Sequence, residues 1–270
     1  MKKNKRDSAI GVFDSGLGGL TVVKELMRQL PHENIVYFGD TARVPYGTKS
    51  KESIVRFSRE NVTLLLKHNV KMVVVACNTS LSVALGVLRR QFRLPVLGVI
   101  NPGAKKAAQV TRNKKIGIIA TMATINSKSY AKNIRAFDRS IKVFGKACPL
   151  FVPLAEEGWF SKKITFEVAK EYLKGVKSFG ADTLILGCTH YPLLKNVVQK
   201  VMGRSVNLVD SAKEVAFEVK ELLKTTGMER ARKDKPSRLF LVSDEPKHFL
   251  KQARRFLGCE VKNVRKTNSV

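Results

Sequence analysis

Two cysteines stand in matching settings along the chain. Cys77 follows the apolar run Lys71–Ala76, and Cys188 follows a second run, Thr183–Leu186, with the two thiols 111 residues apart. Polar residues and then a helical pattern come after each, so each thiol is expected where a strand ends and a helix begins. The helix dipole and its free N–H groups favour thiolate at such a place. A lone cysteine there is more often a small core residue, but a matched pair points to function.

Two opposed thiols suit one reaction in particular, the inversion of the α-carbon of an amino acid. One thiolate removes the α-proton while the opposite thiol returns one, and the roles exchange in the reverse direction. Donors around the substrate carboxylate would stabilise the carbanion. No lysine stands in a context typical of pyridoxal phosphate, and the four cysteines lack zinc spacing, so we expect neither cofactor nor metal.

A glycine-rich loop, Asp14–Gly19, follows the first apolar run. It is not a dinucleotide loop, because Thr21 stands where the third glycine is required, and it lacks the Gly-Lys-Ser/Thr of a Walker A motif. We interpret Asp14 as an acid/base partner or amine anchor and Ser15 as a hydrogen-bond donor. The alternative for Asp14 is a helix N-cap.

Other polar residues flank the thiols. His190 lies two residues after Cys188 and could orient or reprotonate it, or it could be a polar residue at a helix start. The turn-rich segment Gly39–Gly47 indicates by itself only a loop. Cys148 and Cys259 have no comparable setting and are expected to be bystanders.

The elements that must position these residues alternate between short apolar runs and helical patterns, which predicts parallel sheets with helices on both faces. Strands are expected at residues 9–13, 35–38, 71–76, 95–100, 116–120, 141–144, 183–186, 206–209 and 239–242, and helices at 20–30, 53–66, 80–92, 126–137, 166–179, 193–202, 212–224 and 247–256.

The pattern restarts near residue 115, which indicates an internal repeat. The strands that start at Ile10 and Ile116 are 106 residues apart, close to the spacing of the two cysteines. Ligands of such folds lie beyond the carboxyl ends of the strands, so two related α/β halves could direct both thiols at one cleft. The turn signature Asn101-Pro102-Gly103 is a plausible boundary between the halves.

Composition excludes several classes. The chain has 270 residues and is 44% hydrophobic, enough for a substantial core and unlike a disordered or fibrous chain. No segment has the pattern of a signal peptide or a membrane span, so we expect a cytoplasmic protein. The net charge is +28, and residues 101–150 hold eleven Lys or Arg and one acid, Asp138. Such charge favours a solvated surface or, alternatively, a nucleic-acid contact.

From Ile10 to Gly258 the chain resembles bacterial glutamate racemase, through DSGLGGLTV, GDTARVPYG, ACNTS, CPLFVPLAEEG and LGCTHYPLL in this order. The resemblance implies cofactor-independent interconversion of L- and D-glutamate, supply of D-glutamate for peptidoglycan, and a homodimer. It implies two pseudo-symmetric, doubly wound parallel-sheet α/β domains with the active site in the cleft between them. The predicted limits are 8–100 with 210–258, then 101–209, with basic tails at 1–7 and 259–270.

The resemblance also assigns roles. Cys77 and Cys188 would be the acid/base pair, assisted by Asp14, His190 and Glu156, the last preferred over Glu157. The substrate-binding residues would be Asp14, Ser15, Asp40, Pro45, Tyr46, Gly47, Asn78, Thr79, Thr189 and His190. One departure is Asn101-Pro102-Gly103, where the family usually has Glu-Pro-Gly, and another is the charge of +28.

Two alternatives stay open. Aspartate racemases and single-cysteine decarboxylases are mechanistic neighbours, although Cys188 disfavours the decarboxylase and Cys-Thr-His-Tyr resembles the glutamate branch. A protein that contacts nucleic acid or DNA gyrase is the alternative from another class, and it rests on the basic stretch Lys105–Lys146.

Overall fold

Two parallel β-sheets organise the computed structural model, which describes residues 5–232, 234–262 and 264–267. The first sheet has the strand order β10-β9-β2-β1-β3-β4 and the second β6-β5-β7-β8, and the pairings among the described strands are all parallel, as expected. The strands are β1 (Ala9–Asp14), β2 (Ile35–Gly39), β3 (Val70–Val75), β4 (Val96–Gly98), β5 (Lys115–Ala120), β6 (Lys142–Ala147), β7 (Thr183–Gly187), β8 (Asn207–Asp210), β9 (Arg238–Val242) and β10 (Val264–Lys266).

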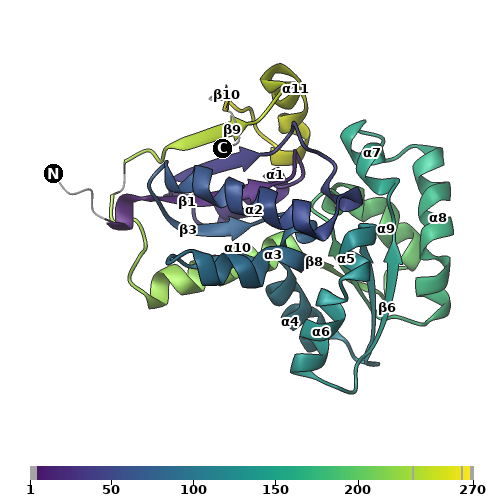
Figure 1. Cartoon of the computed structure of the whole chain (residues 1–270). Helices are drawn as coiled ribbons and strands as arrows, with labels where there is room; N and C mark the ends of the chain where they lie inside the picture. Colours follow the sequence, from purple (N-terminus) through teal and green to yellow (C-terminus); the bar gives the residue numbers. More distant parts are fainter. Residues whose placement is uncertain (1–4, 233, 263, 268–270) are drawn as a thin grey trace.

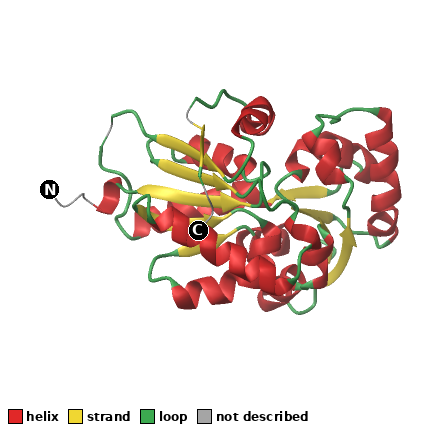
Figure 2. Cartoon of the chain, turned by 45° about the horizontal axis from the view of Figure 1, so that its top comes forward, coloured by secondary structure: helices red, strands yellow, loops and turns green. Residues whose placement is uncertain are grey.

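Helices cover both faces of the strands (Figure 2). They are α1 (Leu20–Gln29), α2 (Lys51–Leu66), α3 (Asn78–Gln91), α4 (Ile100–Val110), α5 (Met122–Asn126), α6 (Ser129–Phe137), α7 (Phe151–Glu156), α8 (Lys163–Ser178), α9 (Lys195–Met202), α10 (Ser211–Thr225) and α11 (Pro246–Leu257), with 3-10 turns η1 (Lys5–Asp7), η2 (Tyr46–Thr48) and η3 (Tyr191–Leu194). Strands β1 and β7 are buried along their whole length. Helices cover both faces of such strands, which is why their sequences are almost entirely apolar.

The two sheets repeat one topology. The order β2-β1-β3-β4 in the first sheet matches β6-β5-β7-β8 in the second, and each set runs in the same chain order. Cys77 follows β3 and Cys188 follows β7, so the two thiols occupy equivalent places. The internal repeat read from the sequence is therefore also present in the order of the strands.

One hydrophobic core connects the two sheets. It contains residues of both, such as Val74 of β3 and Ile118 of β5, together with Ala104 of α4 and Ala212 of α10. Helices α4 and α10 contact each other, so the core is continuous between the two sheets through these helices (Figure 1).

The domain limits implied by the resemblance, 8–100 with 210–258 and 101–209, remain a prediction. None of the helices in the described part of the chain is long and apolar enough to cross a membrane.

The turn predicted at Asn101-Pro102-Gly103 is wrong, because these residues lie in the first turn of α4. Proline is tolerated there, since a first-turn N–H has no partner within the helix. Gly103 is buried against α10, and a Cβ atom at this position would lie 2.8 Å from Ser211 Oγ. The motif therefore begins a helix that links the sheets.

Three further elements differ from the expectation. The helix expected at residues 126–137 is divided into α5 and α6 at Lys128, whose φ is 56°. Helix α7 was not expected. Within the predicted tail at 259–270, β10 pairs with β9 and forms the edge of the first sheet, and the Thr267 N–H donates to Val242 O. Residues 1–4, 263 and 268–270 of the predicted tails lie outside the described residues.

Candidate active site

Cys77 caps the N-terminus of α3. Its buried Sγ accepts a hydrogen bond from Ser80 N at 3.5 Å and lies 3.6 Å from Ser15 Oγ. Burial and the nearby charge of Asp14 raise the pKa of this thiol to about 11, although the bonds to Ser80 and Ser15 act in the opposite direction. The sequence favoured thiolate here, but desolvation outweighs the helix N-terminus. In the ligand-free protein Cys77 is therefore a neutral thiol.

Asp14 ends β1 and is fully buried. Its Oδ2 accepts from Gly16 N at 3.2 Å, while its Oδ1 has no hydrogen-bond partner among the described residues. Burial raises the pKa of Asp14, and the charge of His190 lowers it. A buried carboxylate oxygen without a partner costs free energy unless a ligand donates to it, so this oxygen is suited to receive an ammonium or hydroxyl group.

Cys188, His190 and Glu156 form a chain of contacts. Cys188 Sγ lies 3.8 Å from His190 Nδ1, and His190 Nε2 lies 2.9 Å from Glu156 Oε1. The ring of His190 also packs edge-on against Phe256 of α11. Burial lowers the pKa of His190, but the hydrogen bonds and charges of Cys188 and Glu156 outweigh it and raise the pKa to about 10. His190 is therefore protonated at neutral pH and lies beside the sulfur of Cys188.

The glycine-rich loop brings the two thiol settings together. Thr21 Oγ1 donates to Thr189 O at 2.9 Å. A Cβ atom at Gly18 would lie 2.6 Å from His190 Nδ1, so only glycine allows the loop to approach this closely. The loop that begins at Asp14 therefore contacts the turn after Cys188, and Asp14 interacts electrostatically with both Cys77 and His190.

The Gly39–Gly47 segment packs beside Cys77. Tyr46 lies in one apolar cluster with Cys77, and a Cβ atom at Gly47 would lie 3.2 Å from Thr121 Cβ. Asp40 is buried behind this segment, where it accepts hydrogen bonds from Tyr46 Oη, Arg43 Nε and Ser243 Oγ. Asp40 thus holds Tyr46 and Arg43 in place. Pro45, after a cis peptide bond, begins the 3-10 turn that contains Tyr46 and Gly47.

Asn78 and Thr79 contact residues that the sequence analysis missed. Thr79 Oγ1 lies 2.9 Å from Thr121 Oγ1, and Asn78 Oδ1 accepts from Tyr130 Oη at 2.7 Å. Thr121 follows β5 as Ser15 follows β1, with the same offset of 106 residues as the two Ile-Gly strands. The repeat could therefore have identified Thr121, whereas no local motif marks Tyr130.

The other two cysteines have different settings, although Cys148 lies in the same apolar cluster as Cys188. Cys148 is buried under α7, where its Sγ donates to Lys146 O at 3.6 Å, and burial raises the pKa of this thiol to about 12. Cys259 is exposed near the end of α11. Among the described residues, neither sulfur has an imidazole contact of the kind that Cys188 makes with His190.

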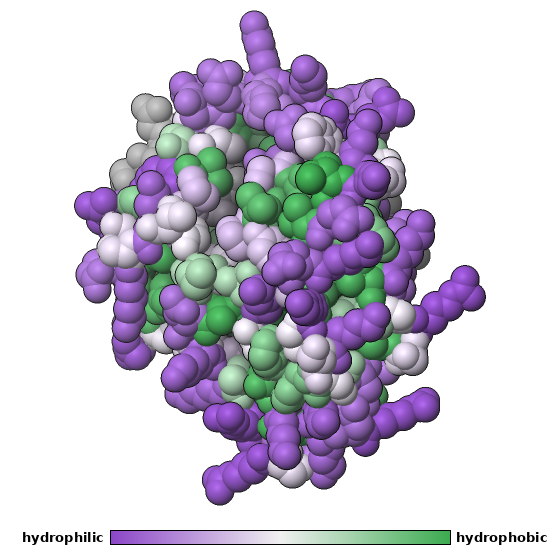
Figure 3. Space-filling view, turned by 90° about the vertical axis from the view of Figure 1, so that its right-hand side faces the viewer, coloured by the Kyte–Doolittle hydropathy of each residue, from purple (hydrophilic) through white to green (hydrophobic). Residues whose placement is uncertain are grey.

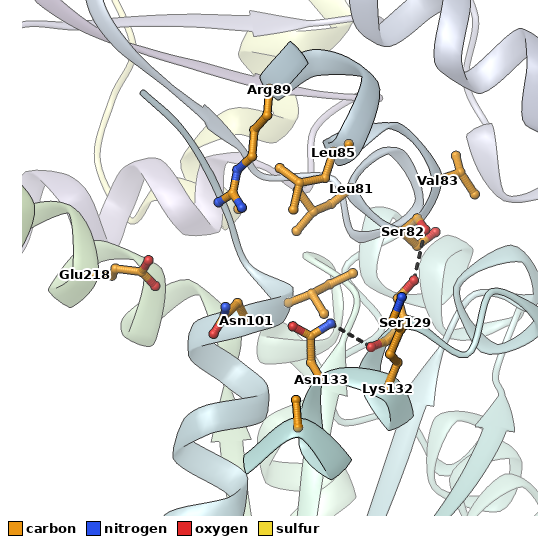
Figure 4. Close-up of a pocket in the computed structure, with 14 residues that line it drawn as sticks. Leu81, Ser82, Val83, Leu85, Arg89, Asn101, Ser129, Lys132, Asn133 and Glu218 are labelled. Carbon is orange, nitrogen blue, oxygen red and sulfur yellow. Dashed lines mark hydrogen bonds between the residues drawn. The ribbon is translucent and has the colours of Figure 1, made fainter. Parts of the chain in front are cut away.

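A separate cavity of about 320 Å³ lies between α3, α4, α6 and α10 (Figure 4). Arg89 and Glu218 approach it from two sides, and Ser129 Oγ donates to Ser82 O at 2.9 Å along its wall. Neither Cys77 nor Cys188 lines it. The cavity therefore lies along α3, away from Cys77 at the N-terminal end of that helix.

The arrangement supplies two thiols that differ in their ionisable neighbours. Two buried sulfur atoms occupy equivalent places after β3 and β7, one neutral beside Asp14 and the other beside a protonated His190. Hydroxyl and amide donors of Ser15, Asn78 and Thr79 surround the first thiol's helix terminus. Such donors are suited to a carboxylate and to the carbanion that forms beside it.

Comparison with known proteins places the chain among related sequences. The family model for Asp/Glu/Hydantoin racemase matches residues 10–218. A curated glutamate racemase of Geobacter metallireducens is 49% identical over 256 residues, covering 95% of this chain and 95% of the relative. One from Chlorobaculum tepidum is 46% identical over 263 residues, covering 97% of each chain.

Solved structures also match nearly the whole chain. The crystal structure of glutamate racemase isoform RacE1 from Bacillus anthracis matches with a TM-score of 0.94 at 39% identity, covering 97% of this chain and 98% of that one. A glutamate racemase from Francisella tularensis, solved in complex with D-glutamate, matches with a TM-score of 0.92 at 38% identity and the same coverage.

Proposed function

The chain belongs to the Asp/Glu/Hydantoin racemase family and is an isomerase, and we propose that it interconverts L- and D-glutamate by moving the α-proton between Cys77 and Cys188. The observation that carries the proposal is the pair of thiols at equivalent strand ends, each with its own ionisable partner.

In the proposed reaction glutamate lies between the two sulfur atoms. Thiolate on Cys188, stabilised by protonated His190, removes the α-proton from one enantiomer, and the neutral thiol of Cys77 delivers its proton to the opposite face. The product leaves Cys77 as thiolate and Cys188 as thiol, which is the state required for the reverse reaction. The net change is inversion at the α-carbon, with one proton removed and one added.

The surrounding residues have proposed roles in holding the substrate. Asn78 and Thr79 offer an amide and a hydroxyl at the N-terminus of α3, which suits the α-carboxylate. The unpartnered oxygen of Asp14 suits the substrate ammonium group. Tyr46, Gly47, Thr189 and His190 complete the proposed pocket, and Glu156 acts through His190.

The proposal extends to the biological setting that the resemblance implies. D-glutamate would supply peptidoglycan synthesis, with the enzyme acting in the cytoplasm as a homodimer. Light scattering during size-exclusion chromatography tests the dimer directly.

The first test is racemisation of L-glutamate in D₂O without added cofactor. Circular dichroism and proton NMR monitor the reaction. We expect optical activity to fall as deuterium enters the α-position. L-aspartate is the matched control, because it differs by one methylene group. Faster racemisation of aspartate would overturn the choice of glutamate, and absence of both racemisation and exchange in folded, reduced protein would overturn the proton-transfer mechanism.

A further inference from the structure

A wide groove lies between the N-terminal end of α8 and helix α9, on the side of the molecule opposite the first sheet (Figure 1). Its volume is about 1020 Å³, and neither Cys77 nor Cys188 lines it. Lys162 and Lys163 line one side, Lys200 and Arg204 line the other, and Phe160 and Phe166 contribute aromatic rings. We call it the α8–α9 groove.

The charge of the groove is unbalanced. No aspartate or glutamate lines it, and its four cations form no ion pair within the described part of the chain. A second hollow of about 510 Å³ shares Phe166 and Lys200 with it and continues along α8. This extension adds three lysines and two glutamates, of which one pair, Lys170 and Glu167, is in contact at 3.2 Å. Like charges held close together repel, and a bound polyanion would relieve that repulsion.

The start of α8 adds to the positive potential. Its N-cap is Lys162, which provides no side-chain acceptor, and its first turn contains no acidic residue. The positive end of a helix of 16 residues is therefore left without the usual anionic partner. Lys162 and Lys163 lie at this same end, so the helix dipole and the two side-chain charges both make the potential more positive.

The floor of the groove is apolar. Phe160 and Phe166 are half-buried, so part of each ring is accessible, and Leu193 and Val197 lie between the cations. Figure 3 views this side of the molecule, where long hydrophilic side chains project around smaller hydrophobic areas. Cations that follow a backbone beside aromatic rings that stack on bases are the combination found in single-strand binding surfaces.

We propose that the α8–α9 groove binds single-stranded nucleic acid, with phosphates on Lys162, Lys163, Lys200 and Arg204 and bases against Phe160 and Phe166. An anionic partner fits this groove, because four cations and no acidic residue line it. A concave surface also fits a flexible strand better than a flat bilayer. The binding is separate from the thiol site and independent of the proposed racemisation.

The test is fluorescence anisotropy of a labelled 15-nucleotide oligo-dT with the full chain, measured across a series of salt concentrations. The groove variant carries Lys163→Gln, Lys200→Gln and Arg204→Gln. The control variant carries Lys220→Gln, Lys224→Gln and Lys247→Gln, which remove the same charge from exposed positions on α10 and α11. Thermal unfolding by circular dichroism verifies that both variants fold.

We expect the groove variant to lose about two units from the slope of log K against log salt, since each phosphate contact on a single strand contributes about 0.7. The control variant should keep the slope. Phe166→Leu should weaken binding about tenfold without changing the slope, because it removes stacking but no charge.

Three outcomes would overturn the proposal. Equal losses in the groove and control variants would mean that net charge alone attracts the strand. Undetectable binding at about 50 mM salt, where phosphate contacts are strong, would exclude a nucleic-acid site. Equal affinity for a duplex, with no effect of Phe166→Leu, would exclude single-strand recognition by stacking.

Discussion

Tyr130 of α6 donates a hydrogen bond to Asn78 Oδ1 at 2.7 Å, and its Oη also lies 2.8 Å from Ser211 Oγ at the start of α10. Tyr130 is buried and interacts electrostatically with Cys188, while Asn78 is the residue after Cys77. Because Oδ1 of Asn78 accepts from Tyr130, its Nδ2 is left as a donor for a ligand. A tyrosine near one thiol thus fixes an amide next to the other.

Tyr130→Phe is therefore predicted to raise KM for glutamate about fivefold, the effect of losing one neutral hydrogen bond of about 1 kcal/mol. The amide of Asn78 would be free to turn over, and kcat should change less. Tyr172→Phe is the control, since Tyr172 Oη accepts a hydrogen bond from Leu150 N and, within the described part of the chain, forms none with a proposed site residue. Steady-state kinetics in both directions measure the effect. A fall in kcat at constant KM would indicate that Tyr130 acts through Cys188 instead.

Substitution of either proposed catalytic thiol should nearly abolish racemisation. Cys77→Ser and Cys188→Ser are each expected to lower the rate about 10³-fold, within the range for loss of a general acid or base. Each variant keeps one thiol, so each should still exchange the α-proton of one enantiomer, and the two variants should exchange opposite enantiomers. Proton NMR in D₂O on pure L- and D-glutamate measures this.

The bystander cysteines provide the matched controls. Cys148→Ser and Cys259→Ser should be nearly silent in the same assay. If only one of Cys77 and Cys188 mattered, the reaction would use a single base, and the two-thiol proposal would be wrong.

His190 should titrate at unusually high pH. Its pKa is raised to about 10, against an ordinary value near 6.5, while that of His68 is lowered by burial. In an NMR titration His190 should therefore lose its proton well above the ordinary range. Glu156→Gln removes one of the charges that raise this pKa and should lower it, whereas Glu157→Gln should not. An unchanged titration in Glu156→Gln would contradict the contact.

The raised pKa values of His190 and Cys77 make the free energy of unfolding depend on pH in the alkaline range. A histidine whose pKa is raised by folding stabilises the native state fully below about 6.5 and loses that contribution as the pH rises to about 10. Cys77 acts in the same direction, because the unfolded thiol ionises first and the folded one only near pH 11. The free energy of unfolding should therefore fall between about pH 6.5 and 11. Urea unfolding at several pH values tests this, and Cys77→Ala with His190→Asn should flatten the curve.

Gly103→Ala should destabilise the protein by about 1–3 kcal/mol, because the new methyl group would lie 2.8 Å from Ser211 Oγ in a packed interior. Gly86→Ala in α3 is the matched control, since its Cβ would meet only the end of Arg90 at 3.5 Å. That substitution should stabilise by about 0.5–1 kcal/mol, the usual gain over glycine within a helix. Equal effects of the two, measured by thermal unfolding, would contradict the packing of α4 on α10.

Periodicity predicted the strands and most helices because buried parallel strands are apolar throughout and amphipathic helices repeat every three to four residues. Periodicity failed where contacts with distant parts of the chain decide the local conformation. Asn101-Pro102-Gly103 has the composition of a turn, yet it lies in the first turn of α4, where Gly103 packs against Ser211. The catalytic roles assigned from the resemblance stay predictions, although Glu156 rather than Glu157 contacts His190. Tyr130 could not be predicted, because its contact with Asn78 spans 52 residues without a shared motif.

The matching strand order of the two sheets has one more consequence. Two identical halves related by exact symmetry would give both sulfur atoms the same surroundings and therefore the same proton affinity. Here both halves lie in one chain, so each can change without the other, and one sulfur lies near a carboxylate while the other lies near an imidazole. The broken symmetry therefore places different ionisable groups beside the two sulfur atoms, and in the proposed reaction these groups would assist opposite proton transfers.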